Sequence, residues 1–90
     1  MSSALDVATW MFGRVQRDGE LYQDDAAAEI EAKFGKRFIY ENENGNPAIG
    51  REVLKHFRQL TERTVVWERG ERYWRKRESS DPKNKRQADY

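Results

Sequence analysis

Apolar residues recur with helical spacing near the N-terminus and predict a first helix. Four of them fall on one helical face: Val7, Trp10, Met11 and Val15. Ser3 precedes this run and can cap the helix, while Asp6 lies in the first turn, where a carboxylate favours the helix dipole. Gly19 is a typical left-handed stop, so the helix is expected to end at Asp18-Gly19.

Two further segments show the same periodicity. One begins at Asp24 and Asp25 and is expected to end at Gly35, with a buried stripe of Ala27, Ile30 and Phe34. The other is expected to begin at Gly50 and to run to about Thr61. Its predicted buried face comprises Val53, Leu54, Phe57 and Leu60.

The pattern then changes to that of a β-hairpin. Two runs rich in β-branched and aromatic residues, Thr64–Trp67 and Arg72–Lys76, flank a turn in which Gly70 is expected to supply a positive φ. For a loop of two or four residues, Trp67 lies opposite Arg72 and Val65 opposite Trp74 on the inner face, with Val66 and Tyr73 on the other. A hairpin alone is marginal in water, so the tryptophan-rich face must pack on the helices.

The remaining segments connect these elements. Glu20–Tyr22 is too short for a helix and is interpreted as an extended link, a candidate strand of a small sheet. Phe38–Tyr40 is expected to be extended, and Glu41–Pro47, with its Asn44-Gly45 pair, to be a turn-rich connection. The predicted fold class is therefore α+β: a small winged-helix-like domain over residues 1–78, with three helices and a C-terminal two-stranded hairpin. Residues 79–90 are expected to form a flexible polar tail.

A chain of 90 residues has one modest core. The apolar stripes and the inner hairpin face predict its members: Trp10, Met11, Ile30, Phe34, Val53, Phe57, Leu60 and Trp67.

Charge is distributed unevenly along the chain. The net charge of +1 combines −4 for residues 1–50, +5 for residues 51–77 and zero for residues 78–90. A basic second half indicates an anionic partner more directly than the overall pI does. The alternative is that two solvated faces merely segregate by sign.

The sequence lacks the residues that several kinds of chemistry require. There is no cysteine, and His56 is the one histidine, so a thiolate or histidine metal site is not expected. Asp24 and Asp25 are interpreted as helix-capping charges, and no phosphate-binding glycine motif is present. We therefore expect no cofactor, no metal and no catalytic residues, and predict that the protein is not an enzyme. Neither a signal peptide nor a membrane span is indicated, which predicts a cytoplasmic location.

The order of helix, link, helix, connection, helix and hairpin resembles that of winged helix-turn-helix domains. In such domains the third helix enters the major groove of DNA and the hairpin forms a wing beside it. The resemblance places candidate nucleic-acid-binding residues on the third helix and on the hairpin: Arg51, Lys55, Arg58, Gln59, Arg69 and Arg75. The alternatives are ordinary solvation of these side chains and, for Arg72, a cation–π stack on Trp67.

Two short motifs are similar to those of small bacterial and phage-type proteins. The first, L-Y-Q-x-D-A, corresponds to Leu21–Ala26, and the second, W-E-R-x-x-R-Y-W-R, to Trp67–Arg75. This similarity implies no particular activity.

Two functional hypotheses follow. The first is a DNA-binding module, for example a small transcriptional regulator. It binds double-stranded DNA through its basic second half. The alternative is a protein-interaction module that docks on a larger protein machine and regulates it, using the acidic second helix with Asp25, Glu29 and Glu31. The sequence predicts no oligomeric state.

Deletion of residues 79–90 is expected to leave stability nearly unchanged, because this segment has no apolar stripe and contains Pro82. Thermal denaturation of the full and shortened chains measures this. A substantially lower midpoint for the shortened chain would contradict the prediction.

Overall fold

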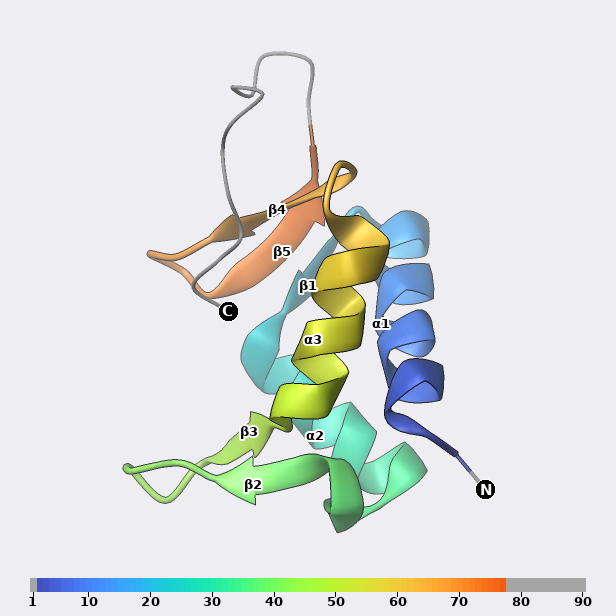
Figure 1. Ribbon diagram of the computed structural model, residues 1–90. Helices are drawn as coiled ribbons and strands as arrows, with labels where there is room; N and C mark the ends of the chain where they lie inside the picture. The colour runs from blue at the N-terminus through green and yellow to red at the C-terminus, as the bar shows by residue number, and fades with distance from the viewer. Residues whose placement is uncertain (1, 78–90) are drawn as a thin grey trace.

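Three α-helices and two small sheets make up the part of the chain that the computed structural model describes, residues 2–77 (Figure 1). The predicted polar tail lies outside these residues. The elements in chain order are α1 (Ala4–Asp18), β1 (Glu20–Tyr22), α2 (Gln23–Phe34), a 3₁₀ turn (Lys36–Phe38), β2 (Ile39–Glu41), β3 (Pro47–Ile49), α3 (Arg51–Thr61), β4 (Val65–Glu68) and β5 (Tyr73–Lys76). The predicted α+β class, with three helices and a C-terminal hairpin, is confirmed.

The ends of α1 follow the local sequence. The Ser3 hydroxyl accepts a hydrogen bond from the Asp6 amide, and the Asp6 carboxylate accepts one from the Ser3 amide, which is a complete capping box. Gly19 ends the helix with a φ of 83°, and its amide donates to the Val15 carbonyl. The predicted bounds of this helix are confirmed because both ends depend on neighbouring residues alone.

The C-terminal hairpin belongs to a three-stranded antiparallel sheet of order β1-β5-β4. Glu20–Tyr22, predicted as a link and candidate strand, forms the edge strand β1, in which Leu21 pairs with Trp74. The sheet thus joins a segment before α2 to the end of the described chain. Its inner face carries Leu21, Trp74 and Trp67 in one cross-strand row.

The predicted register of the hairpin is wrong by two residues. Trp67 pairs with Trp74, and Val65 pairs with Lys76, around a four-residue loop. This register sets the two indole rings 4.8 Å apart on the inner face, so both large side chains are buried together. A shift of two residues preserves the alternation of faces, which is why the inward direction of Trp67 and Trp74 was nonetheless predicted.

The predicted role of Gly70 in the turn is also wrong. The positive φ, 58°, belongs to Arg72, the last residue of the loop. The Arg72 carbonyl accepts a hydrogen bond of 2.9 Å from the Gln23 amide at the start of α2. This contact between distant parts of the chain accompanies the unusual backbone conformation of Arg72.

The connection between α2 and α3 contains a second hairpin, β2–β3. Strand β2 overlaps Phe38–Tyr40, which was predicted to be extended, whereas the second strand, β3, was not predicted. The Asn42 side chain accepts hydrogen bonds from the amides of Asn44 and Asn46 and so shapes its tip. At its base the Gly50 amide donates to the Phe38 carbonyl at 2.7 Å, and a Cβ on Gly50 would lie 2.9 Å from that oxygen. Gly50 therefore allows the close approach that joins this hairpin to the start of α3.

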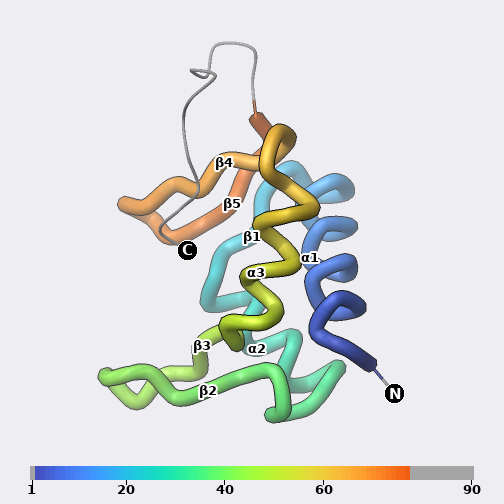
Figure 2. Tube along the Cα trace, viewed as in Figure 1, coloured from blue at the N-terminus to red at the C-terminus, as the bar shows by residue number. Residues whose placement is uncertain are grey.

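The core lies between the three helices and the three-stranded sheet, with α1 and α3 side by side (Figure 2). The Phe57 ring meets the Trp74 ring edge-on, with centroids 5.1 Å apart. Five predicted core residues are buried: Met11, Ile30, Val53, Phe57 and Trp67. Trp10 and Phe34 are only half-buried and pack against the core with their rings 5.9 Å apart.

Leu60 was predicted to be buried and is 39% exposed. Thr61 takes the buried position instead, because it follows Phe57 by four residues on the inner face of α3. Its hydroxyl donates to the Phe57 carbonyl at 2.7 Å, so its burial leaves that donor satisfied.

Replacing Phe57 by alanine is expected to lower the free energy of unfolding by about 3–5 kcal/mol, because it removes the ring between α3 and the sheet. Chemical denaturation measures the change. Leu60→Ala on the same helix is the matched control and should cost far less, since Leu60 is exposed. An equal loss in both variants would contradict the position of Phe57 in the core.

Candidate nucleic-acid interface

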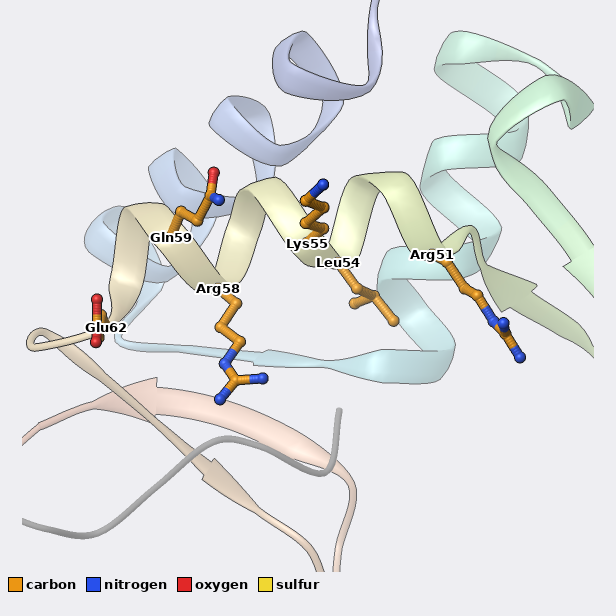
Figure 3. Close-up of a pocket in the computed structure, with 6 residues that line it drawn as sticks. All are labelled: Arg51, Leu54, Lys55, Arg58, Gln59 and Glu62. Atoms are coloured by element: carbon orange, nitrogen blue, oxygen red, sulfur yellow. The ribbon is translucent and has the colours of Figure 1, made fainter.

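The exposed face of α3 carries most of the predicted site residues. A surface depression of about 530 Å³ lies along it, and Figure 3 shows the side chains that line it. These residues are Arg51, Leu54, Lys55, Arg58, Gln59 and Glu62. In this view Arg58 extends toward the strands of the β4–β5 hairpin. Four of the six predicted residues therefore share one surface.

Helical geometry accounts for this surface. Val53, Phe57 and Thr61 follow one another at four-residue intervals and form the buried side of α3. The residues that line the depression occupy the other side of the helix at the same interval. Arg51, Lys55 and Gln59 form one row, and Leu54, Arg58 and Glu62 form the next. Burial of the first set fixes the orientation of the others toward solvent.

The polar side chains of this surface are available to a ligand. Arg51, Lys55, Arg58 and Gln59 are exposed, and within residues 2–77 no ion pair or side-chain hydrogen bond engages them. A guanidinium without an internal partner keeps its full set of donors for an anion.

The two hairpin residues differ from each other. Arg69 is exposed in the β4–β5 loop, at the tip where it was predicted. Arg75 was expected to face a partner freely, but its side chain is only 20% exposed on β5. It lies 3.7 Å from the Glu68 carboxylate and donates to the Lys76 carbonyl. Cross-strand pairing thus directs Arg75 to a structural contact, away from the α3 depression.

Two residues of the depression were not predicted. Leu54 was assigned to the core and is half-buried at its rim, while Glu62 adds a carboxylate among the basic groups. Their signal is the i+4 spacing on either side of Arg58, which places all three in one row. The alternative contact for Arg72 is not observed, since Arg72 makes no cation–π contact with Trp67 in the described chain.

An acidic depression of about 450 Å³ lies between α1, β1 and α2. Its lining includes four carboxylates and one arginine: Asp18, Glu20, Asp25, Glu29 and Arg14. Arg14 donates to Asp18 at 3.2 Å and also to Glu29, so it joins α1 to α2. At the edge of this surface, Tyr22 stacks on Tyr73 with ring centroids 4.8 Å apart.

Asp18 is the titrating group most affected by this network. Hydrogen bonds from Arg17, with a further contribution from Arg14, lower the pKa of the Asp18 carboxyl from 3.8 to about 2. The hydrogen bond to Glu29, and to a lesser extent the one to Asp18, raises the pKa of Arg14, while the hydrogen bond to Asp18 raises the pKa of Arg17. The carboxylate therefore stays charged across the physiological range and remains a partner for both arginines.

Two other kinds of site, a metal site and a membrane-spanning helix, have no counterpart in residues 2–77. In residues 2–77, histidine and carboxylate side chains do not gather in groups of three or more that could hold a metal ion. None of the helices in that range has the length and apolar character needed to span a membrane.

Residues 3–76 match the DUF6953 family, a family of unknown function, and the chain belongs to that family. The match covers both the α3 surface and the acidic depression. No curated protein and no solved structure matches the chain.

The Asp18 carboxyl is expected to titrate with a midpoint near pH 2, which NMR of its side-chain carbon measures. Because its pKa is lowered in the folded state, its contribution to stability is present above pH 3.8 and is lost as the pH falls toward 2. Arg17→Ala should raise the midpoint toward 3.8, whereas Arg37→Ala, distant from this network, should not. A midpoint unchanged by Arg17→Ala would contradict the assigned cause.

Proposed function

We propose that this domain binds double-stranded DNA through the exposed face of α3 and the β4–β5 hairpin. The observation that carries the proposal is the set of Arg51, Lys55 and Arg58, which share one depression without an internal ionic partner in residues 2–77. Holding three like charges together on one helix is unfavourable unless solvent or an anion compensates them. Phosphate groups provide that compensation when DNA binds.

The dimensions of α3 agree with this proposal. It has 11 residues, and the major groove, about 12 Å wide, admits one α-helix. Arginine can donate hydrogen bonds to the acceptor edge of guanine, and a glutamine such as Gln59 can form hydrogen bonds with adenine through its side-chain amide. Lys55 is suited to phosphate, since its ammonium group acts as a point charge. The face therefore combines groups for positioning on DNA with groups that can read bases.

The order of elements supports a winged-helix arrangement. The segment between α1 and α2 pairs with the C-terminal hairpin and anchors it beside α3, which supports our assignment of this hairpin as a wing. Arg69 at its tip is the basic residue we assign to the DNA backbone. The β2–β3 hairpin, inserted before α3, is a departure from the simplest arrangement. On this proposal the domain serves binding and carries no catalytic residues, as in a small transcriptional regulator.

A second candidate function is protein interaction, and the acidic depression is the observation that favours it. Its carboxylates face solvent beside the exposed Tyr22, whose ring is held in place by Tyr73. A rigid aromatic ring next to charged groups is typical of an anchor for a protein partner. In this case the domain would dock on a larger protein through α1, β1 and α2.

Titration of labelled random-sequence duplex DNA at low and moderate salt tests the first proposal. Affinity should fall steeply with salt, and Arg58→Ala or Arg69→Ala should lower the log–log salt slope by about one unit for each phosphate that the variant no longer neutralises. Lys33→Ala is the matched control, since Lys33 is exposed on α2, away from the proposed surface. Its removal should leave the slope unchanged.

Charge reversal in the acidic depression separates the two candidate functions. Asp25→Lys should leave DNA binding intact or strengthen it, whereas it should abolish capture of a protein that docks on that depression. Absence of duplex binding even at low salt would contradict the DNA proposal. A stoichiometric protein retained from native lysate after nuclease treatment, and no longer retained by the Asp25→Lys variant, would then support the interaction module.

A further inference from the structure

One edge of the three-stranded sheet is formed by β1, which within residues 2–77 pairs with β5 on one side only (Figure 1). The Gly19 carbonyl and the Gln23 amide form backbone hydrogen bonds across to the β5 side of the sheet. In an antiparallel pair such bonds recur at every second residue, so Leu21 also directs its backbone groups toward β5. Glu20 and Tyr22 direct theirs to the other side, which we call the free edge of β1.

The backbone groups at this free edge are open to a further chain. The amide and carbonyl of Glu20 and the amide of Tyr22 form no hydrogen bond within residues 2–77. All three residues of β1 line the acidic depression, so this depression runs along the strand. Unpaired amides and carbonyls in a row at a sheet edge are a template for another extended chain.

The charge around the free edge is negative. Glu20 and Asp25 line the depression and are exposed, and neither forms an ion pair in the described part of the chain. Burial raises the pKa of the Tyr22 hydroxyl, and the charges of Glu20, Glu71 and Asp25 raise it further, which shows that these carboxylates surround the ring. A basic chain therefore finds complementary charge here, whereas an acidic one is repelled.

The side chains of β1 define where a paired strand would place its own. Leu21 is buried in the core, whereas Glu20 and Tyr22 are exposed on the outer face of the sheet. A strand beside β1 would set alternate side chains on this outer face, one next to the Glu20 carboxylate and another next to the Tyr22 ring. Lysine or arginine suits both places, through an ion pair with the carboxylate and a cation–π contact with the ring.

We propose that the free edge of β1 binds an extended basic segment of a partner protein as a fourth strand, with lysine or arginine at alternate positions. This inference rests on the protein-interaction candidate function and names the kind of segment that the acidic depression would bind. Backbone hydrogen bonds would supply affinity, and the alternate basic side chains would supply specificity. A second copy of this chain fits less well, because pairing β1 with its own copy would bring like carboxylates together.

Fluorescence anisotropy of the full chain with a short labelled peptide of alternating lysine and valine tests the proposal. The peptide should bind, and Glu20→Lys should abolish binding. Glu52→Lys is the matched control, since it makes the same charge change at an exposed position of α3 and should leave binding intact. The same peptide with N-methyl groups on its backbone amides keeps its charge but cannot donate to the edge, so it should bind about tenfold more weakly or worse.

Two variants of Tyr22 isolate the contribution of its amide. Tyr22→Ala removes the ring, and Tyr22→Pro removes both the ring and the amide hydrogen. Proline fits this position, because the φ of Tyr22 is −79° and its amide takes no part in the pairing of β1 with β5. The two variants should have similar circular dichroism, and Tyr22→Pro should bind the peptide about tenfold more weakly than Tyr22→Ala.

Equal binding of the peptide and its N-methylated form would overturn the proposal, because charge alone would then account for the affinity. Absence of peptide binding would overturn it as well. A wild-type dimer that dissociates in Tyr22→Pro would in that case assign the edge to a second copy of the chain. A protein captured from native lysate and lost in Asp25→Lys, without any binding of the peptide, would leave the protein-interaction function standing and reject this mode of binding.

Discussion

The packing of Trp74 against Phe57 determines the arrangement of this domain. Trp74 is fully buried in the central strand of the three-stranded sheet, with its ring against Phe57 of α3 and Trp67 of the neighbouring strand. Leu21 pairs with it from the other side. A two-stranded hairpin has little stability alone, so this contact with α3 both forms the hairpin and fixes its position. Together with the pairing of β1 and β5, this contact holds the hairpin beside α3.

The same packing separates the charges of the molecule. Because Phe57 points inward, the helical repeat places Arg51, Lys55 and Arg58 on the outer face of α3. On the other side of the core, Arg14 neutralises part of the acidic surface by pairing with Asp18 and Glu29. The acidic charges are thus partly engaged in holding α1 to α2, whereas Arg51, Lys55 and Arg58 of α3 make no ion pair within residues 2–77. This difference is the physical basis for our proposal that DNA binds at α3.

Two surfaces with different chemistry lie on the helices that form the core. The basic face lies on α3, and the acidic depression lies between α1, β1 and α2. A helix buried on one side only leaves two flanks for other contacts, which lets a small domain combine several binding surfaces. The surfaces need not compete, because their side chains point in different directions around the helix axes.

The sequence alone determined the features that depend on neighbouring residues. The capping box of Ser3 and Asp6, the stop at Gly19 and the helical spacing of the α3 residues act within a few positions, so the helices and the basic face of α3 were predicted. Tertiary structure decided the rest. The register of the hairpin follows from burying Trp67 against Trp74, and the contact between Gly50 and Phe38 joins the second hairpin to α3. Leu60 is exposed and Arg75 is paired with Glu68 for the same reason. The neighbours that cover or pair with a side chain come from distant parts of the sequence, and a local pattern does not reveal their positions.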